Sequence, residues 1–596
     1  MTSKAKPTDR SPSASRFDPG RAIDVLGSFS FIGDGERGAL VGPRGDIVWM
    51  CAPRWDSGAV FSTLIGGTSS YTIAPHDRFT WGGYYEPRSL IWRSRWVTGS
   101  GILESREALG RPSDPERVVL LRQVRSLKGT HEVDVELKPA AEFDRFPLSE
   151  VHRADGGWTG RLGDLWMRWS VPSSLQVRRF ERGARLVGRM VISPGKSADL
   201  VLEISTIPFG DDVADVAQSW RRTEEVWRSD VPALENSLDP QGASLSVAVL
   251  HGLTSSSGAM VAAATTSLPE RAEDGRNYDY RYAWIRDQAL AAQAAAAAGV
   301  PQLLDAAVGF LTSRLLEDGP DLAPAYRTDG RRVPSQKRVK LPGYPGGFDR
   351  TGNHVNRQFQ LDVFGESLLV FAAADRLGRL EGPSRSAARI AARAVASRWR
   401  EADAGIWEID NRAWTHSRLM CVAGLRHASN QRLGSTSEVS KWSALADEIL
   451  AHVSSTSTHA GGYWQRSPDD PHVDASLLFA ALRGAVSPDD TRSAFTLEAV
   501  VEQLCEYGYA YRFRHGESPL AKVEGSFVLC SFLVALNLHQ QGRSAEALAW
   551  FERAAGCTGS SAIYGEEWDV RERQVRGNLP QAFVHALHLE SSVTIK

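Results

Sequence analysis

Carboxylate and aromatic side chains occur together in several short segments of this sequence. The first, from Asn277 to Asp287, holds four aromatic and four charged residues. Sugars present apolar CH faces bordered by hydroxyls, so aromatic planes can cover the faces while Arg and Asp bind the hydroxyls. The alternative is a helix start at which Asp287 is only a structural ion-pair partner. The candidate binding residues here are Tyr280, Trp284, Arg286 and Asp287.

A second segment, 404–409, contains one carboxylate, Glu408, between Trp407 and Ile409. An apolar setting can raise the pKa of a carboxyl group, as a general acid working near neutral pH requires. Glu408 is therefore a candidate acid and Trp407 a candidate sugar-binding residue. A surface glutamate on a turn would give the same sequence.

A third segment, 563–569, places two adjacent acids, Glu566 and Glu567, between aromatic residues. A general base must be ionised to take a proton from water. Glu566 is a candidate for that role and Glu567 for substrate binding. The alternative is a solvated acidic turn.

A fourth segment, 343–362, is rich in amides, which suit neutral, hydroxylated ligands. Gln360 and Asp362 are its candidate binding residues. Its alternative role is a helix start that Asn356 caps, with the helix running from 358 into 366.

Several functional classes lack their signatures. There is no phosphate-binding loop, nucleophilic Ser/His/Asp set or cluster of metal ligands, so we expect no metal and no cofactor. The net charge of −2 gives no basic patch for nucleic acid or an anionic membrane. The five scattered cysteines favour a reducing compartment. The polar N-terminus lacks a secretory h-region, and we expect a cytoplasmic protein.

Two styles of hydrophobic pattern divide the chain. Short strand-like runs with Gly and Pro turns predict an antiparallel β-sandwich over 22–207, after a disordered tail at 1–21. Residues 208–240 resemble a linker, helical from 213 to 227. About twelve helical segments follow in 241–596. Paired helices closing into a toroid would explain them, but the pattern does not distinguish a closed toroid from an open array.

From Ile23 to Leu589 these motifs resemble glycoside hydrolase family 15, which includes glucoamylases, bacterial glucodextranases and some bacterial trehalases. Further matching segments are 31–35, 45–51, 474–477 and 523–527. The resemblance implies a β-sandwich followed by an (α/α)6 barrel, and an inverting mechanism without a cofactor. It implies that Glu408 is the general acid, that Glu566 is the general base, and that Trp284, Arg286 and Asp287 hold the non-reducing glucose.

The substrate expected from this resemblance is an α-glucan or α-gluco-oligosaccharide, from whose non-reducing end β-glucose is released. The alternatives are a trehalase of the same family and a non-catalytic carbohydrate-binding or regulatory module. The loops 343–351 and 514–522, and Trp568 after the acid pair, depart from the family pattern. They leave the acceptor sugar open. A homo-oligomer is possible, and no interface is visible in the sequence.

Overall fold

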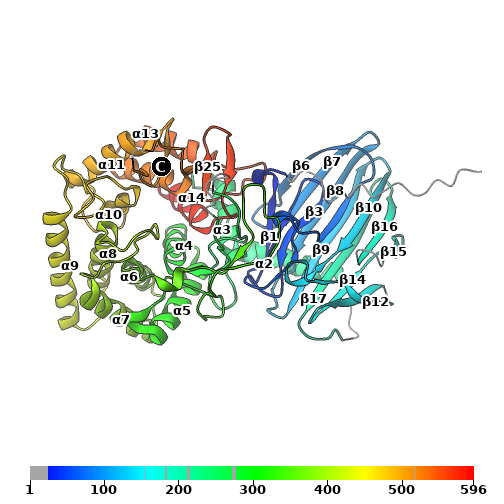
Figure 1. Cartoon of the computed structure of the whole chain (residues 1–596), viewed down its shortest axis with the longest axis horizontal. Helices are drawn as coiled ribbons and strands as arrows, with labels where there is room; N and C mark the ends of the chain where they lie inside the picture. Colours follow the sequence, from blue (N-terminus) through cyan, green and yellow to red (C-terminus); the bar gives the residue numbers. More distant parts are fainter. Residues whose placement is uncertain are drawn as a thin grey trace, which may run out of the picture.

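The computed structural model has a β-rich part and a helical part that lie side by side along the long axis of the molecule (Figure 1). The structure describes residues 24–154, 156–180, 184–210, 215–270, 277–516 and 518–595. The tail predicted at 1–21 lies outside these ranges. Within them, no helix combines the length and apolar character needed to cross a membrane.

Two eight-stranded sheets with antiparallel pairing form the β-rich part. The first has the order β1-β2-β3-β5-β10-β16-β15, with β4 paired to β3, and the second β12-β13-β14-β17-β9-β8-β7-β6. The strands of the first sheet are β1 (Ser30–Gly33), β2 (Gly38–Val41), β3 (Asp46–Cys51), β4 (Ala59–Phe61), β5 (Ser70–Pro75), β10 (His131–Lys138), β15 (Gln176–Phe180) and β16 (Arg185–Ile192). Those of the second are β6 (Phe79–Tyr85), β7 (Trp92–Thr98), β8 (Gly101–Leu109), β9 (Arg117–Lys128), β12 (Ser149–Ala154), β13 (Gly157–Leu162), β14 (Leu165–Ser170) and β17 (Ser197–Ser205).

Alternation of side chains explains why these segments form a sandwich. In β16, Leu186, Met190 and Ile192 are buried while Arg189 and Val191 are exposed, as expected when successive residues of a strand point to opposite faces. Both sheets supply their inward side chains to one hydrophobic core. The antiparallel sandwich predicted from the sequence is confirmed.

Six inner helices form a closed ring in the helical part. Each packs against the next in the order α4, α6, α8, α10, α12, α14, and α14 returns to α4. The outer helices α3, α5, α7, α9, α11 and α13 cover this ring. The helices are α3 (Pro240–Leu253), α4 (Ile285–Ala298), α5 (Pro301–Asp318), α6 (Asp362–Arg376), α7 (Gly382–Arg398), α8 (Thr415–Asn430), α9 (Thr436–Thr456), α10 (Phe479–Leu482), α11 (Thr491–Leu504), α12 (Val528–Gln540), α13 (Ser544–Ala555) and α14 (Ala582–Thr594).

The two rings differ in burial. Inner helix α12 buries every residue from Val528 to Leu538, whereas outer helix α9 buries a single stripe that includes Trp442 and Ala446. A helix that is apolar all round belongs inside, and an amphipathic one belongs on the surface. The bidentate ion pair of Arg483 and Glu590, with one contact at 2.8 Å, also links α10 to α14. The helical part is thus a closed (α/α)6 barrel, a point that the hydrophobic pattern of the sequence did not decide.

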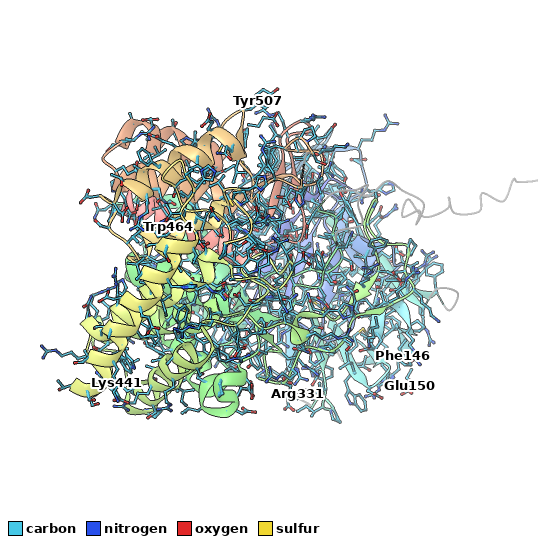
Figure 2. All side chains as sticks on the ribbon, turned by 60° about the vertical axis from the view of Figure 1, so that its left-hand side comes forward. Phe146, Glu150, Arg331, Lys441, Trp464 and Tyr507 are labelled. Carbon is cyan, nitrogen blue, oxygen red and sulfur yellow. The ribbon has the colours of Figure 1, made fainter. Side chains whose placement is uncertain are left out.

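Helix α2 (Val216–Asp230) connects the two parts and packs on the sandwich. The Arg106 guanidinium lies 4.3 Å from the Trp220 ring and that of Arg111 lies 4.1 Å from the Trp227 ring. Figure 2 shows the two parts from another side, with Lys441 of α9 at the outer edge of the barrel and Phe146 at the edge of the sandwich. The predicted linker therefore contains a helix fixed by cation–π contacts.

The helix start predicted near Asn356 is wrong. Residues Val355–Arg357 form a 3-10 turn, and α6 begins only at Asp362, without a side-chain cap from Leu361. The Asn356 amide instead donates to the backbone carbonyl of Val333. A contact with a distant loop has replaced the local cap. Further short elements include α1 (Ala141–Asp144), β11 (Phe146–Pro147), β18 (Ala283–Trp284), β19 (Ala325–Tyr326), β20 (Lys337–Arg338), β21 (Arg350–Thr351), β22 (Cys505–Glu506) and β23 (Tyr509–Ala510).

Candidate active site

A cavity of about 430 Å³ lies where the loops that lead into the inner helices converge. Both candidate catalytic acids, Glu408 and Glu566, line it. Five of the candidate binding residues line it as well, namely Tyr280, Trp284, Arg286, Asp287 and Trp407. The chain thus brings three segments that are far apart in the sequence to one active-site cavity.

A tight turn presents Glu408 to this cavity. The turn begins at Gly405, whose φ is 66°, and ends at Glu408, whose φ is 54°. A Cβ on Gly405 would lie 2.7 Å from the Trp414 ring, so glycine is required. A glutamate in this left-handed region costs about 1–2 kcal/mol. The Asp403 carboxylate accepts from the Gly405 N–H at 2.9 Å and offsets part of that cost.

Two donors hold the Glu408 carboxylate in place. The Trp284 indole Nε1 donates to its Oε1 at 2.7 Å, and the Arg286 guanidinium approaches the same oxygen at 3.4 Å. The side chain is 23% exposed. The apolar surroundings expected from Trp407 and Ile409 are therefore supplemented by hydrogen-bond donors that the local sequence does not reveal.

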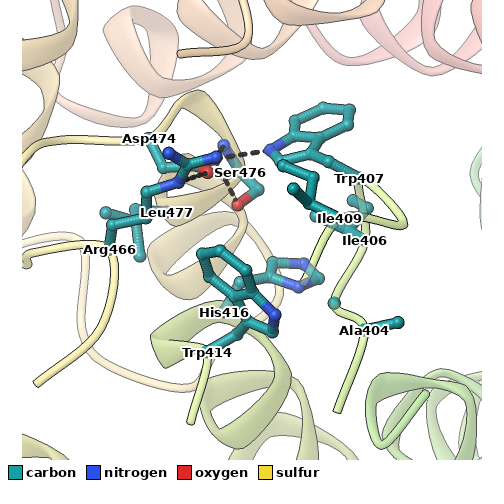
Figure 3. A pocket seen from close by; sticks show the side chains of 11 residues that line it. Ala404, Ile406, Trp407, Ile409, Trp414, His416, Arg466, Asp474, Ser476 and Leu477 are labelled. Carbon is teal, nitrogen blue, oxygen red and sulfur yellow. Dashed lines mark hydrogen bonds and ion pairs between the residues drawn. The ribbon is translucent and has the colours of Figure 1, made fainter. Parts of the chain in front are cut away.

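The Trp407 ring beside Glu408 is fixed from behind (Figure 3). Its Nε1 donates to Asp474 Oδ1 at 2.8 Å. That carboxylate also accepts from the Ser476 hydroxyl at 2.6 Å and pairs with Arg466 at 3.2 Å. On the other side, the Trp407 ring packs edge-on against Phe527 with centroids 5.4 Å apart. The indole can thus cover a sugar face without reorganising.

A small antiparallel sheet places Glu566. Strand β25 (Glu567–Asp569) lies between β24 (Ser526–Phe527) and β26 (Gln574–Arg576). A Cβ on the preceding Gly565 would lie 2.5 Å from Val575 Cγ1 and 2.6 Å from the Arg576 carbonyl oxygen. Only glycine permits this close approach. The sheet joins the 523–527 segment to the acid pair, which explains why both segments belong to one site.

The Glu566 carboxylate is buried, with 4% of the residue exposed. Burial, followed by the neighbouring charge of Glu270, raises the pKa of Glu566 well above its usual value, against the opposing effect of Arg512. The sequence led us to expect a carboxylate that is readily ionised. The structure differs because the carboxyl group is buried and lies near a further carboxylate, Glu270, that the local sequence does not show.

Tyr280 and Trp284 each contact one of the two candidate catalytic acids. The Tyr280 hydroxyl donates to Glu566 Oε1 at 3.1 Å. Its ring packs edge-on against Trp284, with centroids 5.6 Å apart, and Trp284 in turn donates to Glu408. Glu408 and Glu566 are therefore linked by a chain of contacts that runs through two aromatic side chains.

The segment that carries these rings is extended. The carbonyls of Tyr278, Tyr280 and Tyr282 accept backbone hydrogen bonds from residues 262–267. Tyr278 and Tyr280 line the cavity, whereas Arg281 points away. The Arg281 guanidinium donates to the carbonyls of Trp55 at 3.1 Å and Ser57 at 2.9 Å. This alternation assigns the tyrosines to the site and the arginine to the contact with the sandwich.

Arg286 and Asp287 lie in the first turn of α4. Burial raises the pKa of Asp287 to about 7, with the Arg286 charge acting in the opposite direction. Asp287 Oδ1 has no hydrogen-bond partner among the described residues. A sugar hydroxyl would supply that partner, because buried polar groups are normally hydrogen-bonded.

Three of the predicted binding residues do not line the cavity: Glu567, Gln360 and Asp362. Glu567 follows Glu566 in the chain, so its side chain faces the opposite side, where its Oε2 accepts from the Gly525 N–H at 2.8 Å. Gln360 lies behind Arg286, with a contact of 3.3 Å. Asp362 is fully buried in α6. Direct substrate contact is therefore not expected of these three residues.

Two charged residues that the sequence did not indicate line the cavity: Glu270 and Arg512. Arg512 makes a buried bidentate pair with Glu524 and lies 4.7 Å from the Phe527 ring centroid. The alternation of basic and aromatic residues over 511–515 was the available signal for Arg512. For Glu270 the sequence offers none, because the residue begins a charged run, 270–276, that contains no aromatic residue.

Both unusual loops contribute to the lining through one residue each. His515 of the loop 514–522 lies 3.0 Å from Glu524 Oε2 and packs against Phe513. Arg350 of the loop 343–351 lines the cavity, and the Gly343 N–H of the same loop donates to the carbonyl of Ile65 in the sandwich at 2.9 Å. The sandwich thus supports one wall of the site.

Comparisons with known proteins agree with this fold. The model for "Glycosyl hydrolases family 15" matches residues 246–593, and that for "Trehalase-like, N-terminal" matches residues 19–162. The trehalase of Mycobacterium tuberculosis is 30% identical over 96% of this chain and 89% of its own length. The trehalase of Mycolicibacterium smegmatis is 29% identical, over 99% and 92%. A bacterial glucoamylase complexed with acarbose shares the fold, with a TM-score of 0.68, 14% identity and 96% coverage of each chain.

The fold and the match over most of the barrel define a carbohydrate-cleaving enzyme. The chain belongs to glycoside hydrolase family 15 and carries a trehalase-like N-terminal domain. The expectation of an enzyme is thereby confirmed, and the non-catalytic alternative is not supported.

Proposed function

We propose that the protein is a trehalase that hydrolyses α,α-trehalose with inversion, using Glu408 as general acid and Glu566 as general base. The observation that carries the choice of substrate is similarity over nearly the whole chain to two proteins named trehalase, at 30% and 29% identity. It favours the trehalase alternative over the α-glucan hydrolase that the sequence first suggested. The likeness to a glucoamylase, at 14% identity, concerns the fold alone.

The cavity suits a disaccharide with one reacting bond. Its volume, about 430 Å³, falls within the usual range of small-molecule sites, about 300–1,000 Å³. Aromatic rings from Tyr280, Trp284 and Trp407 can cover sugar faces, while Arg286 and Asp287 offer partners for hydroxyls. We assign this first group of residues to the glucose that is attacked. Arg350, Arg512 and His515 are then available to the glucose that leaves.

The reaction needs two proton transfers on opposite faces of one sugar. Glu408 gives its proton to the glycosidic oxygen while the bond from that oxygen to C1 breaks. A water attacks C1 from the other face and gives a proton to Glu566. The attacked glucose leaves as the β-anomer, and the other leaves as the α-anomer because its own C1–O bond stays intact. Inverting enzymes of this kind hold the two carboxyl groups about 6.5–9.5 Å apart, with the water between.

The test of substrate is a kinetic panel of trehalose, maltose, isomaltose and maltooligosaccharides. We expect kcat/KM for trehalose to exceed that for each of the others by at least about 10²-fold, since a site built for one hydrogen-bonding pattern rejects others strongly. Glu408→Gln and Glu566→Gln serve as matched inactive controls. Preference for maltooligosaccharides would restore the glucan hydrolase, and no hydrolysis of any sugar would contradict both readings.

We also keep the proposal that the enzyme acts in the cytoplasm. The five cysteines are unpaired, four of them buried and Cys505 partly exposed. Unpaired thiols suit a reducing compartment. Fractionation of cells with trehalase activity as the readout tests this, and activity found outside the cytoplasm would contradict it.

A further inference from the structure

A third glutamate, Glu270, lines the active-site cavity with Glu408 and Glu566. The proposed mechanism assigns it no role. Only 5% of the residue is exposed, although an unassigned glutamate would normally be on the surface. Burying a carboxylate next to another is costly and calls for an explanation.

Backbone contacts fix Glu270 at this position. The segment 263–269 runs along the segment 577–581: the Gly577 N–H donates to the Pro269 carbonyl at 2.9 Å, and the Thr265 hydroxyl donates to Asn578 Oδ1 at 2.9 Å. Gly577 directly follows β26, the strand paired with the strand that begins after Glu566. The backbone thus ties Glu270 to the same hairpin as Glu566.

Both glutamate side chains lie close to Gly577 of that hairpin. A Cβ built on Gly577 would lie 3.4 Å from Glu566 Oε2 and 3.8 Å from Glu270 Cγ. The Oε2 atom of Glu566 has no hydrogen-bond partner among the described residues, while its Oε1 accepts from Tyr280. The Glu566 oxygen without a protein partner is therefore the one that faces Gly577, and Glu270 lies against the same glycine.

Little positive charge lies near Glu566 to offset the cost of burying its carboxylate. Arg512 supplies the opposing positive charge, but a bidentate contact already commits its guanidinium to Glu524. Asp287 adds to the negative side. Groups facing Glu566 from the elements around it are Glu270, Tyr280, Asp287, Arg512 and its chain neighbour Glu567. Among these, Glu270 is the strongest source of negative charge.

We propose that Glu270 is a positioning residue that acts through Glu566: its fixed negative charge strengthens Glu566 as the proton acceptor during water activation. The inference rests on the proposed function, since it assumes that Glu566 is the base. In that step a water O–H bond breaks, its proton passes to Glu566, and the water oxygen forms the new bond to C1. The proton on Glu408 goes to the leaving oxygen, so the charges balance without Glu270 gaining or losing a proton.

The test compares pH profiles of kcat/KM on trehalose for four variants and the wild type. In Glu270→Gln we expect the acid limb to move down by about one pH unit, because a like charge beside the base is removed, and kcat at pH 7 to fall about tenfold, because the base is weaker. Glu270→Asp keeps the charge and should restore the wild-type limb to within a few tenths of a unit. Glu572→Gln removes an exposed carboxylate from the same hairpin and should leave the profile unchanged.

Other outcomes overturn the inference. A loss of kcat in Glu270→Gln without movement of the acid limb, or a movement to higher pH, means that Glu270 serves only the structure. If Glu270→Gln does not fold, as judged by its thermal unfolding, Glu270→Met provides a neutral side chain of similar volume for the same comparison. Glu566→Gln distinguishes a failure of the base assignment from a failure of the Glu270 proposal. If Glu566→Gln retains turnover, Glu566 is not the general base. If Glu566→Gln is inactive and Glu270→Gln leaves the acid limb unshifted, only the role proposed for Glu270 is contradicted.

Discussion

The wall of the cavity that carries Glu408 and the wall that carries Glu566 differ in their surroundings. Glu408 is partly exposed and accepts from two donors, Trp284 at 2.7 Å and Arg286 at 3.4 Å. Glu566 is buried beside Glu270 and accepts from Tyr280 alone among the described residues. One wall surrounds its carboxylate with hydrogen-bond donors and the other with negative charge.

This difference in surroundings explains how two glutamates can take different roles. A carboxylate crowded by others has a raised pKa and binds a proton strongly, which a water-activating base requires. Its pKa also sets the lowest pH at which the base is ionised. We therefore expect activity to fall on the acid side above the ordinary pKa of a glutamate, about 4.3.

The largest expected effect comes from removing either acid. On trehalose, Glu408→Gln and Glu566→Gln should each lower kcat by about 10²–10⁴-fold or more. On α-glucosyl fluoride the two variants should separate, because fluoride leaves without a proton: Glu408→Gln keeps turnover near that of the wild type and Glu566→Gln stays inactive. Fluoride release measured with an ion-selective electrode distinguishes them. The reverse pattern would exchange the two roles.

A second effect concerns the ion pair behind the Glu566 wall. Arg512 and His515 outweigh burial and lower the pKa of Glu524 to about 2. Glu524→Gln leaves a buried guanidinium without its partner and should cost about 3–5 kcal/mol in the free energy of unfolding at pH 7. Because the folded pKa is depressed, this stability is present above the unfolded pKa, about 4.3, and is lost as the pH falls toward 2.

Urea unfolding from pH 7 down to pH 3 measures both parts of this prediction. The wild type should lose stability between about pH 4.3 and 3, and Glu524→Gln should lose less over the same window. Glu448→Gln, in the exposed pair with Arg400, is the control and should behave as the wild type. Equal stability of wild type and Glu524→Gln at pH 7 would mean that this pair does not support the wall.

Removing the hydrogen-bond donor to either glutamate, Tyr280 for Glu566 or Trp284 for Glu408, should have smaller effects on kcat. The two variants should differ in their pH profiles. Tyr280→Phe removes a hydrogen bond to ionised Glu566, worth about 1.5–3 kcal/mol, and Trp284→Phe one to protonated Glu408, worth about 0.5–1.5 kcal/mol, so kcat should fall about 10–100-fold and about 2–10-fold, respectively. The Tyr280 bond favours ionised Glu566, so its loss should move the acid limb of the pH profile upward. Trp284→Phe should leave that limb in place. Identical shifts in both variants would show that the walls are not independent.

The smallest effect is expected from a change at Gln360, which lies behind the residues that line the cavity. Gln360 contacts Arg286 at 3.3 Å and not the cavity, so Gln360→Ala should cost about 0.5–1.5 kcal/mol of binding. This appears as a rise in KM of about 2- to 12-fold with kcat unchanged. A fall in kcat as large as that of Trp284→Phe would place Gln360 in direct contact with the substrate.

Much of the fold could be predicted because local patterns repeat. Alternating burial in strands such as β16 and the apolar stripes of the outer helices are periodicities that the sequence displays. Closure of the helical ring could not be predicted from them, because the contact of α14 with α4 joins segments about 300 residues apart. The pattern of a helix does not state which helix it packs against.

Some features of the site were likewise predictable from the sequence, and others were not. The motif with Trp284, Arg286 and Asp287 was predictable because its residues are contiguous. The charge around Glu566 was not, because Glu270 reaches it through a backbone pairing between residues 263–269 and 577–581. Glu567 was assigned to the substrate because it adjoins Glu566, yet its position in a strand turns it away.

The most direct test of the central claim is a ¹H NMR spectrum of trehalose hydrolysis in the first minutes, before the glucose anomers equilibrate. With Glu408 and Glu566 working from opposite faces of C1, the initial products should be α-glucose and β-glucose in equal amounts. Formation of α-glucose alone would indicate retention of configuration and contradict the proposed roles of the two glutamates.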